Sequence, residues 1–273
     1  MYTEPRMDTE LTVAERYGAV RERVAAAARR AGRRAEDILL VAVTKYATMD
    51  QVRDLLRLGH LDLGESKAQQ VIQRAAMVEE LLGRSRMLPT VAARASGGPA
   101  EAPTPVRWHM IGHLQRNKVK KLIGVVRLVH SVDSLRLVEE IQAVAFKRDE
   151  PVDVLVQVNC SGERSKFGCA VAAAQHLCEQ IDTMIHLRVR GLMTMAPYAD
   201  DPEASRPTFQ RCAELFDEVR TTGVGGGHFN ILSMGMSNDY ETAIECGANV
   251  VRVGSALFGE RVVAEDTDEE DED

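Results

Sequence analysis

Lys45 follows a short apolar run, residues 38–43, that reads Ile-Leu-Leu-Val-Ala-Val. A branched run of this length without alternation is typical of a parallel strand that is buried on both faces. An amine rooted in such a strand is expected to be desolvated, which favours its neutral form. Because a neutral amine attacks aldehydes to form imines, Lys45 is a candidate nucleophile. The alternative is a lysine that only extends into solvent at a strand end.

Two later segments place small residues where a strand turns into a helix. They are FNILSMGMS at 229–237 and VVRVGSALFG at 250–259. Free backbone N–H groups and the positive end of the helix dipole favour a phosphate at such turns. Gly235 and Gly254 would let the backbone approach the anion, and the hydroxyls of Ser233 and Ser255 could donate to it. Each turn alone is also explained as an ordinary helix cap, whereas two in succession favour a phosphate site.

Arg252 lies two residues before Gly254, so both residues face the same side of their strand. An arginine there would place a fixed cation beside the phosphate turn. The alternative is an ion pair with a carboxylate on a neighbouring strand, such as Glu65. A lysine amine, an anion cradle and a cation at one site together fit a phosphorylated aldehyde, and pyridoxal 5′-phosphate (PLP) is such a ligand.

These residues need a scaffold that brings several strand ends together. Eight strand-like segments are predicted at residues 38–43, 61–65, 107–112, 127–131, 152–158, 187–192, 228–234 and 250–253. Helical patterns lie between most of them, which predicts a parallel α/β sheet, and eight units predict a closed (β/α)8 TIM barrel. In such a barrel the carboxyl strand ends form the active-site face. An open doubly wound sheet is the alternative, and no GxGxxG supports its dinucleotide-binding version.

Helix boundaries are marked by specific residues. Thr12 and Glu15 form a capping-box pattern at the start of the first helix, and Gly32 ends it. A second helix is predicted from Met49 to Leu58, and a third continues to about Leu82. Asp133 is the predicted N-cap of a later helix. After the segment at 228–234, a helix is expected to start near Ser237 or Asn238.

The composition predicts one globular domain with irregular extensions. The chain has 273 residues, of which 45% are hydrophobic and 27% charged, and we expect a single domain over residues 1–262. Residues 84–105 hold four of the nine prolines and are predicted to be a flexible surface insertion, either tolerated or partner-binding. Residues 263–273 are predicted to be a disordered acidic tail.

Charge and cysteine usage exclude several classes of protein. Without the eight carboxylates of residues 265–273, the net charge of −7 becomes +1, so no basic face for nucleic acid is expected. The five cysteines are odd in number and include no CxxC pair, which predicts reduced thiols and no metal site. A signal peptide and an apolar membrane span are both missing, so a soluble cytoplasmic protein is expected.

The residues around Lys45 and the two turns belong to a wider set of familiar motifs. The matching stretches are LLVAVTKY (39–46), LDLGES (61–66), WHMIGHLQRNK (108–118), VHSVDSL (129–135), VLVQVNCSGERSKFG (154–168), VRGLMTMAP (189–197) and LSMGMSNDYETAIECGANVVRVGSALFGER (232–261). With these motifs the chain resembles the PLP homeostasis protein family, whose members are YggS/PROSC-like. The match covers nearly the whole chain apart from the insertion and the two ends.

The resemblance implies a fold and a set of contacts. The fold is a barrel like the N-terminal domain of alanine racemase, of PLP fold type III, as a monomer without the C-terminal β-domain. Lys45 would hold PLP as a Schiff base, and Arg252 would face the pyridine nitrogen. The positions that match or adjoin the phosphate contacts are Ser233, Met234, Gly235, Gly254 and Ser255. Lys166 matches a secondary PLP contact, and a solvated loop lysine explains it equally well.

Three positions depart from the family pattern. Ser66 stands where relatives usually read Asn in GEN, which puts an amide contact to the cofactor in doubt. His113 stands where many read Pro in IGPLQ, and Ser255 replaces a frequent Thr.

The resemblance implies a PLP-binding carrier in intracellular PLP homeostasis that delivers PLP to apo-enzymes without established catalysis. The main alternative is a PLP-dependent amino-acid racemase, and an imine-forming aldolase on a phosphorylated sugar is a third. An arginine at the ring nitrogen disfavours its protonation and weakens the ring as an electron sink. A racemase also needs a second acid/base group on the opposite face of the substrate, which alanine racemases take from their C-terminal β-domain.

Overall fold

The computed structural model describes residues 11–87, 105–163 and 167–259. Its strands are β1 (Leu39–Val43), β2 (Asp62–Glu65), β3 (Arg107–Met110), β4 (Val126–Val132), β5 (Val152–Asn159), β6 (Cys169–Ala170), β7 (Leu187–Met193), β8 (Ile231–Ser233) and β9 (Val250–Val253). Its helices are α1 (Val13–Arg30), α2 (Met49–Arg57), α3 (Ala68–Met87), α5 (Val119–Leu122), α6 (Leu135–Arg148), α7 (Val171–Asp182), α8 (Arg206–Thr221), α9 (Tyr240–Glu245) and α10 (Ser255–Phe258).

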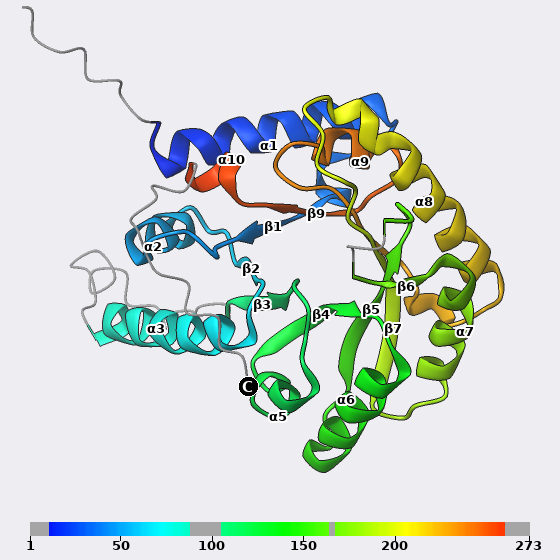
Figure 1. The fold of residues 1–273 in the computed structure, drawn as a ribbon. Helices are drawn as coiled ribbons and strands as arrows, with labels where there is room; N and C mark the ends of the chain where they lie inside the picture. The colour runs from blue at the N-terminus through cyan, green and yellow to red at the C-terminus, as the bar shows by residue number, and fades with distance from the viewer. Residues whose placement is uncertain (1–10, 88–104, 164–166, 260–273) are drawn as a thin grey trace, which may run out of the picture.

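All the strand pairings are parallel, and together they close a barrel. The order β4-β3-β2-β1-β9-β8-β7-β5 is joined into a ring by a further pairing of β4 with β5. The helices surround this ring, as Figure 1 shows in a view along the barrel. The predicted TIM barrel is therefore confirmed and the open doubly wound sheet is wrong. The chain thus brings the carboxyl ends of eight strands to one face.

The first helix forms where its capping pattern predicts. The Thr12 hydroxyl accepts from the Glu15 N–H at 3.2 Å, and the Glu15 carboxylate accepts from the Thr12 N–H at 2.7 Å. The buried residues of α1 lie on one stripe, which packs on α9 and α10. α1 therefore lies on the outside of the barrel, alongside β1 and β9 (Figure 1).

Several element boundaries differ from the predicted ones. β8 begins only at Ile231, because Gly225 and Gly226 adopt positive φ and turn the chain through a short 3₁₀ segment first. β6 was not predicted, since its two residues are too short to show a pattern and pair only with β5. The N-cap position of α6 is Ser134, so the prediction of Asp133 is wrong by one residue.

The ends of α3 and α9 also differ from the prediction. α3 runs to Met87 and so includes the first four residues of the predicted insertion at 84–105, whereas residues 88–104 lie outside the described part. α9 begins at Tyr240, after a turn in which the Asp239 carboxylate accepts from the Met236 N–H at 2.7 Å. The predicted acidic tail at 263–273 lies outside the described residues.

The barrel interior is partly apolar and partly polar. Leu128, Leu155 and Met193 form a small cluster that is separate from the large core between strands and helices. Buried polar side chains from β2, β3, β4, β8 and β9 also occupy the interior: Asp62, His109, His130, Ser233 and Arg252. Because buried polar groups need partners, this interior set must be hydrogen-bonded within itself.

Candidate functional site

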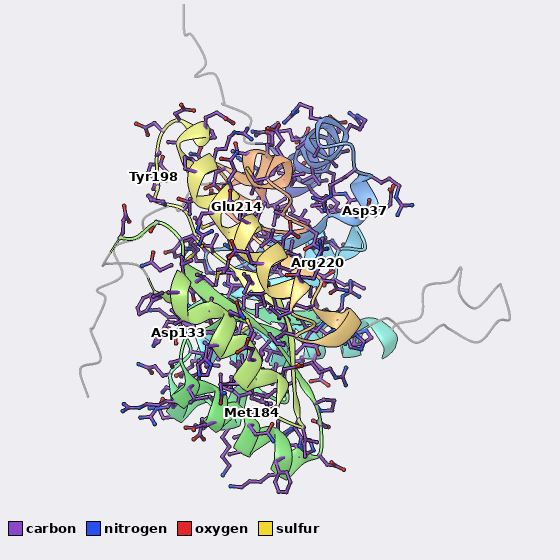
Figure 2. All side chains as sticks on the ribbon, turned by 90° about the vertical axis from the view of Figure 1, so that its right-hand side faces the viewer. Asp37, Asp133, Met184, Tyr198, Glu214 and Arg220 are labelled. Carbon is purple, nitrogen blue, oxygen red and sulfur yellow. The ribbon has the colours of Figure 1, made fainter. Side chains whose placement is uncertain are left out.

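The two ends of the barrel are clearly separated. In Figure 2, Asp133 and Tyr198, which follow β4 and β7, lie on one side of the molecule, and Asp37, which precedes β1, lies on the other. Lys45 comes two residues after the end of β1, and the two predicted phosphate turns follow β8 and β9. The structure therefore brings Lys45 and both turns to the same end, the carboxyl end of the barrel.

Lys45 lies in a turn and its side chain is exposed. Its Nζ is 4.9 Å from the centroid of the Tyr46 ring. The expectation of a desolvated amine is therefore wrong for this structure, because the strand ends at Val43 and Lys45 lies in the turn that follows it. An exposed amine at this position can be reached from solvent.

Glu65 lies beside Lys45 and is fully buried. One of its oxygens, Oε1, accepts from the Thr44 hydroxyl at 2.6 Å and from Arg74 Nε at 2.8 Å. The other, Oε2, is buried with no hydrogen-bond partner in the described part of the chain. Burial raises the pKa of Glu65, and the Thr44 hydroxyl and the charges of Arg74 and Lys45 only partly offset this effect. Glu65 is therefore paired with Arg74, and the alternative in which it pairs with Arg252 is wrong.

The two turns contact each other through one hydroxyl. Ser237, in the first turn, accepts from the Gly254 N–H at 3.0 Å and from the Ala256 N–H at 3.4 Å, both in the second. The sequence analysis named this serine only as a possible helix start and not as a site residue, although it is the last residue of LSMGMS. Ser255 is exposed, whereas Met234 and Gly235 are buried. Backbone N–H groups and hydroxyls of both turns thus gather in one place.

Gly235 is required by the packing of the first turn. It has φ of +87°, and a Cβ there would come within 2.6 Å of Ala243 Cβ on α9. Gly254 has an ordinary φ, and an added Cβ would meet the Val43 carbonyl oxygen at 3.2 Å. Gly254 therefore allows β9 to pass close to the end of β1, from which Lys45 emerges.

Arg252 and Ser233 are bonded to each other inside the barrel. Arg252 is 3% exposed and donates from Nη1 to Ser233 Oγ at 2.6 Å and from Nη2 to the Thr194 carbonyl at 2.9 Å. Thr194 directly follows β7, so the guanidinium lies near the carboxyl end of the barrel. The Ser233 hydroxyl is thus engaged with Arg252, which the prediction of a phosphate contact did not include. Its contact to a phosphate stays a prediction.

Among the described residues, no carboxylate lies within ion-pair distance of Arg252. Within the described residues it makes no ion pair, and burial lowers its pKa to about 10, an effect that the charge of Asp239 only partly offsets. Asp239 itself is buried and accepts from Ser205 Oγ at 3.2 Å. A buried guanidinium without a carboxylate retains N–H donors for a neutral acceptor such as a ring nitrogen.

Two of the departures from the family pattern lie around this end of the barrel. The His113 ring stacks on Phe167, with centroids 4.6 Å apart, and its Nδ1 is 3.7 Å from an Asp133 oxygen. Ser66 is packed against Gly112, where a Cβ would come within 2.2 Å of the Ser66 carbonyl oxygen. Lys166 lies outside the described residues.

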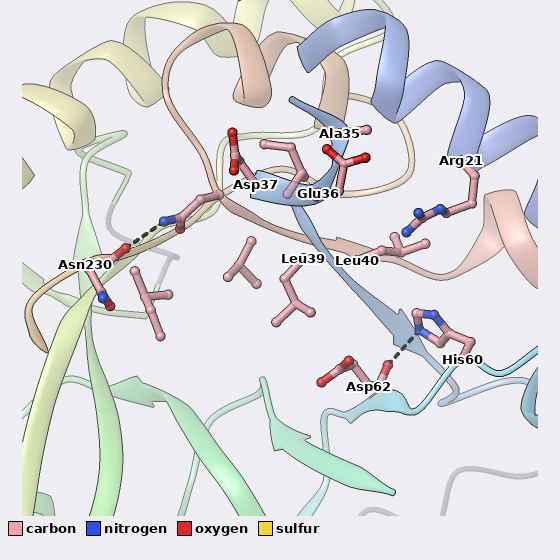
Figure 3. Close-up of a pocket in the computed structure, with 13 residues that line it drawn as sticks. Arg21, Ala35, Glu36, Asp37, Leu39, Leu40, His60, Asp62 and Asn230 are labelled. Atoms are coloured by element: carbon pink, nitrogen blue, oxygen red, sulfur yellow. Dashed lines mark hydrogen bonds between the residues drawn. The ribbon is translucent and has the colours of Figure 1, made fainter. Parts of the chain in front are cut away.

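A cavity of about 420 Å³ opens at the opposite, amino end of the barrel. Figure 3 shows Arg21, His60 and Asp62 on one side of it and Asn230 on the other. Many of its polar groups are already paired: His60 Nε2 lies 3.0 Å from the Asp62 carbonyl, and Asn249 donates to the Asn230 carbonyl at 2.6 Å. This cavity is therefore separate from the site residues at the carboxyl end.

Over residues 11–87, 105–163 and 167–259, no cluster of three or more His, Cys, Asp or Glu side chains is arranged to hold a metal ion. None of the helices described there is both long and apolar enough to span a membrane.

The fold and the site define a class of protein. Residues 16–262 match the family model of the alanine racemase N-terminal domain. The alanine racemase from Corynebacterium glutamicum shares this fold at 13% identity with a TM-score of 0.59, and the match covers 91% of this chain and 63% of the racemase. The chain is thus an alanine racemase N-terminal-type barrel.

Closer relatives narrow the class to one family. The pyridoxal phosphate homeostasis protein of Aquifex aeolicus is 37% identical over 92% of this chain and 99% of its own length. That of Mycobacterium leprae is 34% identical over 92% and 94%. The structure of PipY from Synechococcus elongatus without PLP matches at 25% identity and a TM-score of 0.73, over 91% of this chain and all of PipY. The chain belongs to the pyridoxal phosphate homeostasis protein family.

Proposed function

We propose that this chain binds PLP at the carboxyl end of its barrel and serves as a PLP carrier in intracellular PLP homeostasis. The observation that carries the proposal is the gathering of the Lys45 amine, the buried Arg252 guanidinium and two adjoining turns at one end of the barrel. Family membership supports the same ligand, since PipY has also been solved with PLP bound.

The groups of PLP match the groups that the chain offers. PLP brings an aldehyde that bonds to amines, a ring nitrogen that accepts a hydrogen bond, and a phosphate. Lys45 supplies the amine, and Arg252 supplies donors because no carboxylate occupies its guanidinium among the described residues. For the phosphate, the turns supply the N–H groups of Gly235 and Ser255 and the Ser255 hydroxyl, since the Met234 and Gly254 N–H groups already donate to the Val250 carbonyl and to Ser237 Oγ. Lys166 remains a proposed secondary contact.

The same residues favour holding PLP over catalysis. An arginine only donates, so it does not protonate the ring nitrogen, and an unprotonated ring withdraws electrons weakly. The exposed position of Lys45 lets the cofactor enter and leave from solvent. We therefore propose a monomeric carrier that transfers PLP transiently to apo-enzymes, and racemase activity is the alternative to be tested.

The test is the absorbance spectrum of the purified chain with PLP, before and after borohydride, followed by peptide mass mapping. We expect a visible band that borohydride removes and a pyridoxyl group fixed on Lys45. Lys45→Ala should abolish the band, whereas Lys147→Ala, an exposed lysine in the last turn of α6, should retain it. Labelling of another lysine, or a band that survives Lys45→Ala, would overturn the proposal.

The racemase alternative has its own measurement. L-alanine incubated with the PLP-loaded chain should keep its optical rotation. Racemisation that disappears in Lys45→Ala would show an enzyme and replace the carrier interpretation. A chain that binds sugar phosphates and not PLP would instead favour the aldolase.

A further inference from the structure

A continuous line of hydrogen bonds crosses the barrel interior. From Arg252 it passes to Ser233 at 2.6 Å, to His130 Nδ1 at 3.0 Å, from His130 Nε2 to His109 Nδ1 at 2.9 Å, and from His109 Nε2 to Asp62 Oδ1 at 3.2 Å. All five residues are at most 5% exposed. They come from five different strands, so only the closed barrel brings them together.

The chemistry of the two ends gives this line a direction. A guanidinium only donates, so Ser233 Oγ accepts from Arg252, and the serine proton is free for His130 Nδ1. At the other end Asp62 accepts from His109 and from Arg107 Nε at 2.7 Å. Burial opposes ionisation of Asp62, but the hydrogen bonds from Arg107 and His109 outweigh it and hold the pKa of Asp62 well below its ordinary value. The carboxylate therefore only accepts.

One proton arrangement satisfies every bond between these ends and leaves no proton without an acceptor. His130 accepts at Nδ1 and donates from Nε2, and His109 does the same toward Asp62. Burial lowers the pKa of His130 well below its ordinary value, which agrees with a neutral ring. In the opposite direction, either Asp62 or His109 would have to gain a proton, and in both cases the Ser233 proton would have no acceptor among the described residues. A single direction of donation, from Arg252 to Asp62, thus follows.

We propose that His130 and His109 are positioning residues that orient the Arg252 guanidinium by linking it, through this one-way relay, to Asp62 at the amino end. The relay holds one edge of Arg252 toward Ser233 and the Thr194 carbonyl, which leaves its remaining N–H donors for the ring nitrogen of the proposed cofactor. This last link rests on the proposed PLP function. The relay itself belongs to the chain alone and exists without a ligand.

The relay also explains why Arg252 can be buried without a carboxylate beside it. Ser233 and the two histidines polarise one another between the cation and the distant anion, and hydrogen-bonded chains of this kind strengthen cooperatively. A carboxylate in direct contact would occupy the donor edge of the guanidinium. The positive charge is thus balanced across the barrel while donors remain for a ring nitrogen.

The first experiment is ¹⁵N NMR of the full chain labelled at histidine, without PLP, at pH 7. The signals of His109 and His130 are assigned by their loss in His109→Gln and His130→Gln. We expect both rings to be neutral with the proton on Nε2. A proton on Nδ1 of either ring, or a doubly protonated ring, would overturn the relay.

The second experiment measures PLP release from the loaded chain. His130→Leu removes the acceptor of Ser233, and losing about one net hydrogen bond should speed release roughly tenfold and shift the visible band. His130→Asn keeps an acceptor near the Nδ1 position and should restore much of the wild-type spectrum. The control, His60→Leu, removes a buried histidine that bonds to the Tyr17 hydroxyl and to the Asp62 main-chain carbonyl. It leaves every side-chain bond of the relay in place and should not change the band.

The outcomes separate the two proposals. If both histidines carry Nε2 protons and no PLP binds Lys45, the relay stands and the proposed function fails. If PLP binds Lys45 but either tautomer differs, or if His130→Leu and His60→Leu behave alike, the positioning role fails and the PLP function stands.

Discussion

Replacing Asp62 by Asn removes one charge from the barrel interior at almost constant volume. Asp62 is 5% exposed and accepts two hydrogen bonds from Arg107 and one from His109. An Asn side chain keeps one oxygen as an acceptor but turns an NH₂ group toward an Arg107 donor. The substitution therefore breaks one charge-assisted bond and leaves two donors facing each other.

The size of the effect follows from the exposure of the partner. Removing one member of a fully buried ion pair costs about 3–5 kcal/mol. The Arg107 side chain is 39% exposed, so water can solvate part of its charge, and a loss of about 2 kcal/mol is expected. For a chain of this size, about 2 kcal/mol lowers Tm by roughly 4 °C.

The effect must also depend on pH with a definite sign. Since the pKa of Asp62 is lowered in the folded chain, its contribution is present above the unfolded value, about 4, and declines as pH falls. The stability gap between wild type and Asp62→Asn should therefore be about 2 kcal/mol at pH 7 and smaller by about 1 kcal/mol at pH 3.

Urea unfolding at pH 7 and at pH 3 measures this gap. The matched control is Asp149→Asn, which removes the same charge from a side chain that is 97% exposed. Asp149 has φ of +52°, a conformation that Asn tolerates, so a change below about 0.5 kcal/mol is expected. A gap of equal size at both pH values, or a control that behaves like Asp62→Asn, would refute the reasoning.

Two further predictions concern the backbone and the cofactor site. Gly191→Ala should destabilise the chain by about 3 kcal/mol or more, because Gly191 has φ of +147° and a Cβ would come within 1.8 Å of the Ile231 carbonyl oxygen. Gly18→Ala, in α1 with open space around it, should instead stabilise by about 0.5–1 kcal/mol, and thermal unfolding that ranks them otherwise would contradict this. Arg252→Asp should shift the visible band of the PLP-loaded chain and allow slow side reactions with added amino acids. An unchanged spectrum would show that Arg252 does not face the ring nitrogen of PLP.

The barrel could be predicted from the sequence because its signals are local and repeated. Runs such as residues 39–43 and 250–253 are apolar enough to be buried on both faces, and both form strands close to their predicted limits. The length of β8 was overestimated, because the glycines at 225–227 interrupt the hydrophobic pattern without showing where the next strand starts. β6 is only two residues long, and its pairing with β5 is a tertiary event that no local pattern reveals.

The sequence predicts which residues lie at the carboxyl ends of the strands. It does not predict side-chain exposure or bonds that depend on contacts between distant parts of the chain. Lys45 and both turns lie at the predicted end of the barrel, but the exposure of Lys45 depends on how the chain leaves β1. His109 and His130 lie within WHMIG and VHSVDS, where a histidine on an apolar strand was a usable signal. Their bond joins residues 21 positions apart in the chain and appears only after closure.

The position of the countercharge decides what the buried arginine can do. A carboxylate in contact with Arg252 would pair with its donors and hold them away from a ligand, whereas Glu65 is paired with Arg74 and Asp62 lies at the other end of the relay. Arg252 therefore keeps its positive charge and its free donors together, which suits a neutral ring nitrogen and disfavours its protonation. Lys45, by contrast, is exposed and reachable. On the proposed function, a fixed donor and an accessible amine at the same end of the barrel would hold PLP in one orientation and release it again, without the electron withdrawal that racemisation requires.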